Sequence, residues 1–551
     1  MLLAVVSARA QTPTGIIAGV VNDAAGAPVP AARLRLTNLD SGLTRSLDTS
    51  AEGDYSAATL PPGVYRVTAE AAGFSLLQRT ATVETGTTTT VNLTLQVGEV
   101  RERVTVDTAA PLVNYEHHQV GGLVSRQQIE NLPLNGRNFL ELAKLEPGVT
   151  NPARLNDNRV FVSFLGSGFQ TVPRVGYSRV TVDGASITIP GNAGVIFQVS
   201  QDVVQEFQLS TVNFDLSTGL ASNGAINIVT RSGGNDYHGD GFFFYRDQHL
   251  AAYPGLRRDA GNPQPFFQRQ QSGFRMGGPI RRERAFFFAS YERQDQRGVA
   301  SIQPRTSEFA HLGGIFPSPS IGDQFSARAD VRLNAKHNAF VRYTHDDNGA
   351  FANAFTPTNL PSGWVRRTNQ AGQGLVALTS VLSSRVVNDF RFSYFFVNVS
   401  QRRATAEDCP GCLGLGAPRI TIPDIGLTFG DGGTVSFGGR RYQLTDSLVW
   451  QKGNHRLRFG FDWEHVINTN SDEGVATQIT LWSPGRVRQL NPAIPLPASF
   501  TTLDDILRLP LQSFTIPTSA PAWFRGATFV RIASSINIVS MPATRGASAH
   551  A

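Results

Sequence analysis

The stretch VVQEFQLSTVNFDLSTGLASNGAINIVTRSGGNDYHGDGFFFYRD, residues 203–247, contains a change from one kind of β pattern to another. Its first half ends in the β-prone run at residues 225–230, and a cluster of turn-forming residues follows at 232–236. From Tyr237 to Arg246 the residues are typical of an aromatic-rich strand. We therefore predict that a compact domain ends here and that a region of alternating β-strands begins.

Composition favours a mainly β protein that either lies in a membrane or forms soluble sheets. Charged residues make up 17% of the 551-residue chain, below the roughly 25% that is usual for soluble domains. No run approaches the ~18 apolar residues of a membrane helix. Membrane-spanning β-strands are not excluded, because the hydropathy signal of such strands is weak. The 53 glycines, 31 prolines and 35 phenylalanines suit many strands with tight turns.

The charge pattern and the motifs exclude several functions. The net charge is +6, but the basic residues are scattered and form no patch, so we expect no nucleic-acid partner. No nucleophile elbow, phosphate loop or paired carboxylates stand out, and no histidines have zinc-ligand spacing. We predict no enzyme activity, no cofactor and no metal site.

Residues 14–97 predict an N-terminal β-sandwich, because short strands recur between Gly- and Pro-rich turns. The string AEGDYSAATLPPGVYRVTAEAAGF at 51–74 resembles the carboxypeptidase regulatory-like domain, which is grouped with carbohydrate-binding-like sandwiches. That resemblance implies the fold and no peptidase activity. Upstream, residues 1–10 end in an A-x-A pattern, and we interpret them as the remainder of a signal peptide, with a disordered N-terminus as the alternative.

Residues 116–234 predict an α+β domain. Ser125 and Gln128 fit a capping box that starts a short helix. The string GGLVSRQQIENLPLNGRNFLELAKLEPGV at 121–149 resembles the plug of Oar-like TonB-dependent outer-membrane receptors. Further matches lie at 179–184, 202–207 and 225–233. An arginine-glycine-proline turn common in other plugs is absent between Leu209 and Gly224, which favours the Oar-like group over the siderophore type.

Residues 235–514 predict a partial transmembrane antiparallel β-barrel. The clearest hairpin turns at residues 452–454, where apolar residues of the second strand (Leu457, Phe459, Phe461, Trp463) alternate with charged ones. The strands of a soluble sandwich would also alternate apolar and polar residues. Bulky aromatic residues on one face and charged residues on the other favour strands that face membrane lipid. We expect about ten strands up to Ser483, with edges at 237–246 and 477–483, whereas plugged transporters need about 22. Residues 515–551 are an atypical tail, so we expect a truncated barrel.

Two short segments are the candidate sites. The linker at 98–115 contains a β-branched segment, which is either a last strand or tether, or, as the resemblance implies, the box that pairs with TonB by strand addition. The box residues are Glu102, Arg103, Val104, Thr105 and Val106. Cys409 and Cys412 lie in a long polar loop without the βαβ context of a redox motif, so we predict a structural disulfide between them.

The resemblance implies an outer-membrane receptor with its N-terminal domain in the periplasm. Its expected partners are TonB with the inner-membrane energising complex, outer-membrane lipid, and an unknown bulky ligand such as a glycan or peptide. Its expected function is energy-coupled uptake of that ligand. The alternative is a periplasm-facing carbohydrate- or peptide-binding or adhesion protein that performs no transport.

Overall fold

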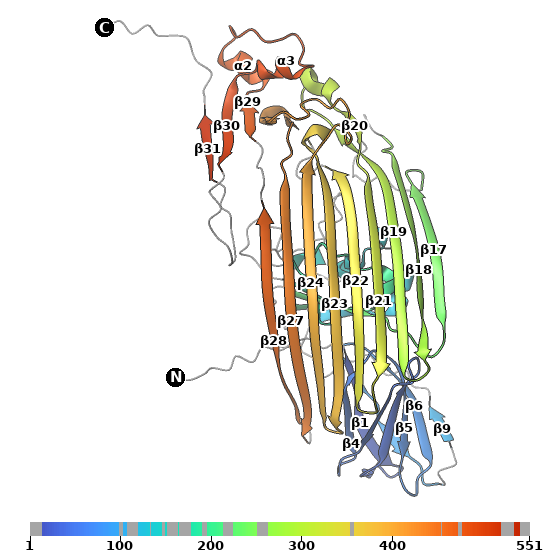
Figure 1. Ribbon diagram of the computed structural model, residues 1–551. Helices are drawn as coiled ribbons and strands as arrows, with labels where there is room; N and C mark the ends of the chain where they lie inside the picture. Colours follow the sequence, from blue (N-terminus) through green and yellow to red (C-terminus); the bar gives the residue numbers. More distant parts are fainter. Residues whose placement is uncertain are drawn as a thin grey trace, which may run out of the picture.

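The computed structural model describes residues 14–98, 103–106, 120–132, 134–145, 149–150, 163–164, 178–189, 195–212, 224–250, 263–352, 358–452, 455–471, 477–518 and 534–539. A β-sandwich lies at one end of a tall sheet, and a smaller domain lies at the other end. An α+β domain, here called the plug after the family domain that its sequence resembles, packs against the face of the sheet that points away in Figure 1. The predicted mainly β fold class is confirmed. None of the helices described is long and apolar enough to cross a membrane.

The N-terminal sandwich consists of two sheets, with strand orders β4-β1-β7 (with β8 on β1) and β3-β2-β5-β6-β9. Its strands are β1 (Gly15–Asp23), β2 (Arg33–Asn38), β3 (Thr44–Asp48), β4 (Asp54–Leu60), β5 (Gly63–Glu70), β6 (Leu76–Val83), β7 (Thr88–Thr90), β8 (Leu93–Leu95) and β9 (Arg103–Val106). Alternate residues such as Leu34 and Leu36 are fully buried between the sheets. Tyr55 donates its hydroxyl to the Val91 carbonyl at 2.6 Å.

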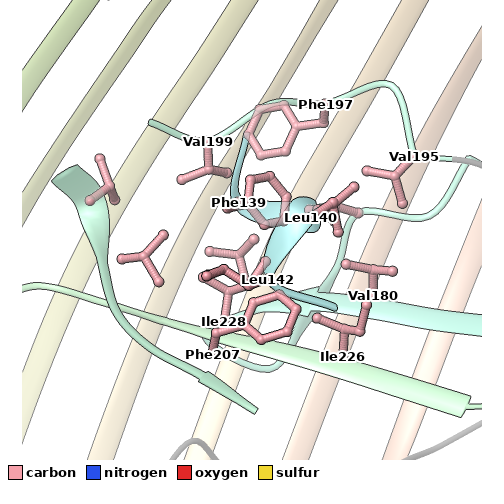
Figure 2. Close-up of a cluster of buried hydrophobic side chains, with 14 of the residues drawn as sticks. Phe139, Leu140, Leu142, Val180, Val195, Phe197, Val199, Phe207, Ile226 and Ile228 are labelled. Atoms are coloured by element: carbon pink, nitrogen blue, oxygen red, sulfur yellow. The ribbon is translucent and has the colours of Figure 1, made fainter. Parts of the chain in front are cut away.

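The plug is a five-stranded sheet with the order β10-β15-β16-β13-β14, packed against short helices. Its elements are β10 (Val120–Val124), α1 (Arg126–Asn131), η1 (Asn135–Arg137), η2 (Phe139–Leu145), β11 (Val149–Thr150), β12 (Ser163–Phe164), β13 (Ser178–Val182), β14 (Ala185–Ser186), η3 (Gln201–Val203), β15 (Val204–Val212) and β16 (Gly224–Thr230). The predicted capping box at Ser125 is present. Figure 2 shows Phe139 and Leu142 in the core, whereas Leu145 at the end of the same 3-10 helix is 53% exposed.

The tall sheet has ten strands in the order β17-β18-β19-β21-β22-β23-β24-β27-β28, with the short β20 beside β19. These are β17 (His238–Asp247), β18 (Phe267–Arg281), β19 (Ala285–Ile302), β20 (Gly314–Pro317), β21 (Ser320–Arg332), β22 (His337–Ala352), β23 (Val365–Ser383), β24 (Val386–Arg403), β27 (Val435–Lys452) and β28 (His455–Ser471). The hairpin predicted at 452–454 is confirmed by the pair Lys452↔His455. Phe461 is 47% exposed on the outer face, and the alternate residue Asp462 faces the plug.

A second small domain, here called the cap, lies beyond the end of the tall sheet that is farther from the sandwich (Figure 1). It has the strand order β26-β25-β29-β30-β31. Its elements, with the adjoining 3-10 helices, are η5 (Ser307–Leu312), η6 (Pro361–Gly363), β25 (Arg419–Ile422), η7 (Pro423–Ile425), β26 (Leu427–Phe429), β29 (Gln478–Leu481), α2 (Pro484–Leu490), α3 (Leu503–Leu507), β30 (Leu511–Thr518) and β31 (Ser534–Val539).

The cap corrects one prediction about the strands. Residues 477–483 were expected to form the last strand of the tall sheet, but β29 pairs in parallel with β25 and antiparallel with β30 instead. Alternation along a strand shows that one face is buried, and it does not show which sheet the strand joins. The edges of the tall sheet, among the residues described, are therefore β17, as predicted, and β28.

Candidate functional site

In the part of the chain that the structure describes, a group of buried hydrogen bonds and ion pairs joins the plug to the tall sheet. It centres on the plug hairpin β13–β14, where Asp183 and Gly184 form the turn with φ angles of 50° and 80°. Asp and Gly are among the residues that tolerate this left-handed region. The turn directs the Asp183 carboxylate into the interface, where the residue is 1% exposed.

The Asp183 carboxylate binds both the plug and the sheet. It accepts hydrogen bonds from the backbone N–H and hydroxyl of Thr230 at 2.9 and 2.7 Å, and from Arg342 Nε at 2.8 Å. Arg328 lies 3.8 Å away. Burial acts to raise the pKa of Asp183, but Arg342, Arg328 and Thr230 together hold it below its usual value. The carboxylate is therefore ionised and fully paired.

The same hairpin is also held by side chains from three strands of the tall sheet. Arg342 donates to the Val182 carbonyl at 3.2 Å, and Arg391 donates to the Asp183 carbonyl. Further along, Arg441 donates to the Ser186 hydroxyl at 2.7 Å and to the Thr188 carbonyl at 2.8 Å. Strands β22, β24 and β27 thus contribute an arginine each to holding the hairpin.

A second group of ion pairs joins the plug to the first strands of the sheet. Arg137 of the plug lies 2.7 Å from Asp202 and 3.2 Å from Glu292 of β19. Glu292 also accepts the Ser200 hydroxyl at 2.6 Å. Arg275 of β18 reaches the plug carboxylates Glu130 and Asp202 at 3.2 and 3.4 Å.

A third ion pair holds the plug at the opposite edge of the sheet. Arg179 at the start of the plug hairpin lies 2.8 Å from Asp462 of β28. Among the described residues, the plug is therefore tied by ion pairs to β18, which lies next to the edge strand β17, and to β28 at the other edge of the tall sheet.

The sandwich is docked on the plug through one buried carboxylate. Thr85, in the turn after β6, donates its backbone N–H to Glu206 of β15 at 2.9 Å. Glu206 is 6% exposed, and burial raises its pKa to about 7. A second contact joins the Asn235 N–H, next to the sheet, to the Asp40 carbonyl of the sandwich at 2.9 Å.

The candidate TonB box is partly within the residues described. Glu102 lies outside them, and Arg103, Val104, Thr105 and Val106 form β9, which pairs in parallel with β6. The segment is thus a last strand of the sandwich sheet, which was the structural alternative considered from sequence. Its role as a TonB box stays a prediction.

The two cysteines lie at the border of the cap. Cys409 is 7% exposed and packs in the cap core, with Cys412 packed against it. Both are thiols in this structure, and burial raises the pKa of Cys409 to about 12. The predicted disulfide between them stays a prediction. The described residues contain no cluster of His, Cys, Asp and Glu that could hold a metal.

Sequence reasoning identified the charged face of the strands but not its partners. Arg342 and Asp183 are 159 positions apart, and nothing in the local pattern joins them. The usable signal was a charged residue in nearly every strand on the face opposite the aromatics, because buried charges need partners.

Two segments of the chain match known families. Residues 16–96 match the carboxypeptidase regulatory-like domain. Residues 229–317 and 303–488 match the outer membrane beta barrel domain. Over 300 residues the chain is 30% identical to the TonB-dependent transporter Oar of Myxococcus xanthus, covering 52% of this chain. The chain is thus similar in sequence to a TonB-dependent transporter. The predicted resemblance to Oar-like TonB-dependent receptors and the predicted outer-membrane localisation are confirmed.

Among solved structures, the chain is similar to outer-membrane transporters and receptors. The transporter YddB from Escherichia coli is 12% identical, with a TM-score of 0.49 over 66% of this chain and 50% of that chain. The ferric enterobactin receptor PfeA from Pseudomonas aeruginosa is 12% identical, with a TM-score of 0.44 over 62% of this chain and 48% of that chain. The chain spans 27% of the length of the Oar relative.

Proposed function

We propose that this chain works as a TonB-dependent outer-membrane receptor for energy-coupled uptake of a bulky ligand such as a glycan or peptide. The observation that carries the proposal is the plug hairpin held by arginines of the surrounding strands through hydrogen bonds and ion pairs. Water can replace such contacts one at a time, so the net cost of moving the plug is smaller than their number suggests. A plug held in this way can shift and still be firmly placed at rest.

The energising partner in this proposal is TonB, and residues 102–106 are its binding segment. Support comes from the position of Arg103–Val106 at the edge of a sheet, where strand addition needs only backbone groups. The sandwich and its edge strand would then lie in the periplasm, on the side from which TonB acts.

A peptide of residues 100–109 tests the assignment. We expect it to bind the periplasmic domain of TonB, and the Val104→Pro peptide to bind more weakly, because proline removes a backbone donor. The measurement is a titration by calorimetry with both peptides. Equal binding of the two peptides, or binding of neither, would remove residues 102–106 as the box.

Comparing cells with and without TonB separates transport from the alternative of ligand binding without transport. A receptor that gates its plug should expose a cysteine placed on β15, for example Ser210→Cys, to a thiol reagent only when TonB is present. Ser210 is 2% exposed at rest, so the background labelling should be low. Labelling that is independent of TonB would favour a binding protein.

A further inference from the structure

Strand β9 forms one edge of a sheet of the N-terminal sandwich. It is the last strand of the sheet β3-β2-β5-β6-β9 and pairs with β6 from Leu76↔Arg103 to Arg79↔Val106. Successive backbone groups of a strand point to alternate sides, so β6 satisfies only half of the donors and acceptors of β9. No strand in the described part of the chain pairs with the other edge. That edge is open to another strand.

The strand that holds β9 leads directly into the contact with the plug. β6 ends at Val83, and two residues later Thr85 donates its N–H to Glu206 of β15 at 2.9 Å. The next residue, Gly86, lies so close to β15 that an added Cβ would stand 2.3 Å from Gln208 Nε2. The turn after β6 is therefore fitted to two side chains of one plug strand.

The same plug strand receives the chain that continues from β9. After residues 107–119 the chain forms β10, which pairs antiparallel with β15 from Val124↔Phe207 to Val120↔Val212. Strand β9 is thus connected to β15 twice, once through the chain and once through β6 and the turn at Thr85. The two connections reach neighbouring residues of β15, Phe207 and Glu206.

We propose that β9 binds its periplasmic partner at its open edge while it stays hydrogen-bonded to β6. The sandwich then carries the pull to plug strand β15 through the contact between Thr85 and Glu206. This inference rests on the proposed function, because it takes TonB as the partner. It assigns the sandwich a mechanical role in opening the plug, and it makes Glu206 a positioning residue for that step.

The direction of the strands fits such a role. A force applied along β9 loads its evenly spaced hydrogen bonds to β6 together, and does not open them one after another. At the far end of β6 the load meets a buried acceptor, because Glu206 is 6% exposed. Breaking this hydrogen bond would leave a buried polar atom without its partner, which is unfavourable.

A reversible cross-link between β6 and β9 tests whether β9 stays in place. Gln78 and Thr105 are partners in the register, so both are changed to cysteine in a full chain that also carries Cys409→Ser and Cys412→Ser. The probe is the purified periplasmic domain of TonB, titrated against the oxidised and the reduced protein. We expect the two Kd values to agree within about threefold, a difference of under 1 kcal/mol.

Binding that needs reduction would overturn the proposal, because β9 would then have to leave β6 to reach TonB. That result would leave residues 102–106 intact as the TonB box. If TonB fails to bind the unsubstituted chain and its 100–109 peptide, the proposed function itself is wrong. The two failures are therefore distinguishable.

Substitution of Glu206 tests the route to the plug. In energised cells, Ser210→Cys reports plug movement by thiol labelling, in the same background without Cys409 and Cys412. We expect Glu206→Leu to reduce this labelling severalfold, since it removes the acceptor for Thr85, and Glu206→Gln to retain it, since an amide oxygen still accepts. Labelling without energy should stay low in both. Equal labelling of the two variants in energised cells would refute the route through Thr85.

Discussion

At the scale of single residues, Asp183 is the side chain on which most of the plug contact converges. Its carboxylate is buried with Arg342, whose side chain is 0% exposed, and it also accepts twice from Thr230. Burial of a charged side chain is unfavourable unless a side chain of opposite charge is buried beside it. Removing one charge should therefore cost more than the loss of a hydrogen bond.

We expect Asp183→Asn to weaken the plug contact by about 3–5 kcal/mol, because it leaves the Arg342 guanidinium buried without its counter-charge. The measurement is the urea concentration at which the plug becomes sensitive to protease. The control is Asp323→Asn, which removes an ion pair to Arg293 whose side chains are 46% and 37% exposed. An exposed pair of this kind is worth at most about 1 kcal/mol. Similar shifts in the two variants would contradict the role of Asp183.

The cysteines give a second prediction at this scale. We expect Cys409 and Cys412 to be joined in protein exported past the inner membrane, where disulfides form and persist. Because burial raises the pKa of Cys409 to about 12, a reduced thiol in the folded protein would scarcely react. Alkylation must therefore follow unfolding, and mass spectrometry should find neither cysteine labelled. Complete labelling of both in exported material would show that no disulfide forms.

At the scale of secondary-structure elements, the cap is the part that most depends on distant packing. Its sheet joins β25 to β29 in parallel, although the long β27–β28 hairpin lies between them in sequence. Its core contains Trp364, which is 0% exposed and donates its indole N–H to the Asn359 carbonyl at 2.6 Å. The loops at this end of the sheet thus form a domain with its own hydrophobic core.

We expect Trp364→Ala to unfold or loosen the cap at a cost of about 3–5 kcal/mol, because it leaves a large cavity in a small core. Limited proteolysis should then cut between residues 404 and 434 while the strands of the tall sheet stay protected. The matched control is Trp463→Ala on the outer face of β28, where the tryptophan is 51% exposed. Cleavage of the control at the same rate would argue against a cap that folds around Trp364.

A feature could be predicted from the sequence when it depends on residues that are close together in the chain. The capping box at Ser125 and the hairpin turn between Lys452 and His455 depend on neighbouring residues, and both were predicted. The place of β29 and the partner of Asp183 depend on contacts between residues far apart in the chain. Alternation predicts that such a residue faces inward, and only the packed structure shows what it meets.

At the scale of the whole molecule, the sandwich contacts both the plug and the chain that leads into the tall sheet. The sandwich touches the plug at Glu206 and touches the chain next to the sheet through Asp40 and Asn235. Asn235 in turn accepts the N–H of Glu283, in the turn between β18 and β19, at 2.7 Å. Among the described residues, these polar contacts help to set how the sandwich sits against the rest of the chain.

The contact at Glu206 should depend on pH. Burial raises its pKa from 4.5 to about 7, and burial also raises the pKa of the facing Glu84. The docked state therefore holds a proton that the undocked state releases, so docking is firmest below pH 4.5 and weakens as pH rises to about 7. For Glu206 the full effect is about 3 kcal/mol.

Hydrogen exchange measures this dependence through the protection factor of residues 84–86, which corrects for the intrinsic rate. We expect protection to be greater at pH 5 than at pH 8, and Glu206→Gln to have a flatter profile because its side chain does not titrate. Protection that rises between pH 5 and pH 8 would contradict the buried carboxylate as the cause.

The pairing of β9 with β6 has a consequence for how such proteins diverge. The contact is made by backbone groups, which every residue except proline supplies in full. Mutations can therefore replace most residues of this segment during evolution and leave its place in the sheet unchanged. Descendants of a common ancestor would keep the strand order long after their alignments at residues 102–106 had become unrecognisable. For this segment, the common origin of two proteins is better preserved in the strand order of the sheet than in the amino-acid sequence.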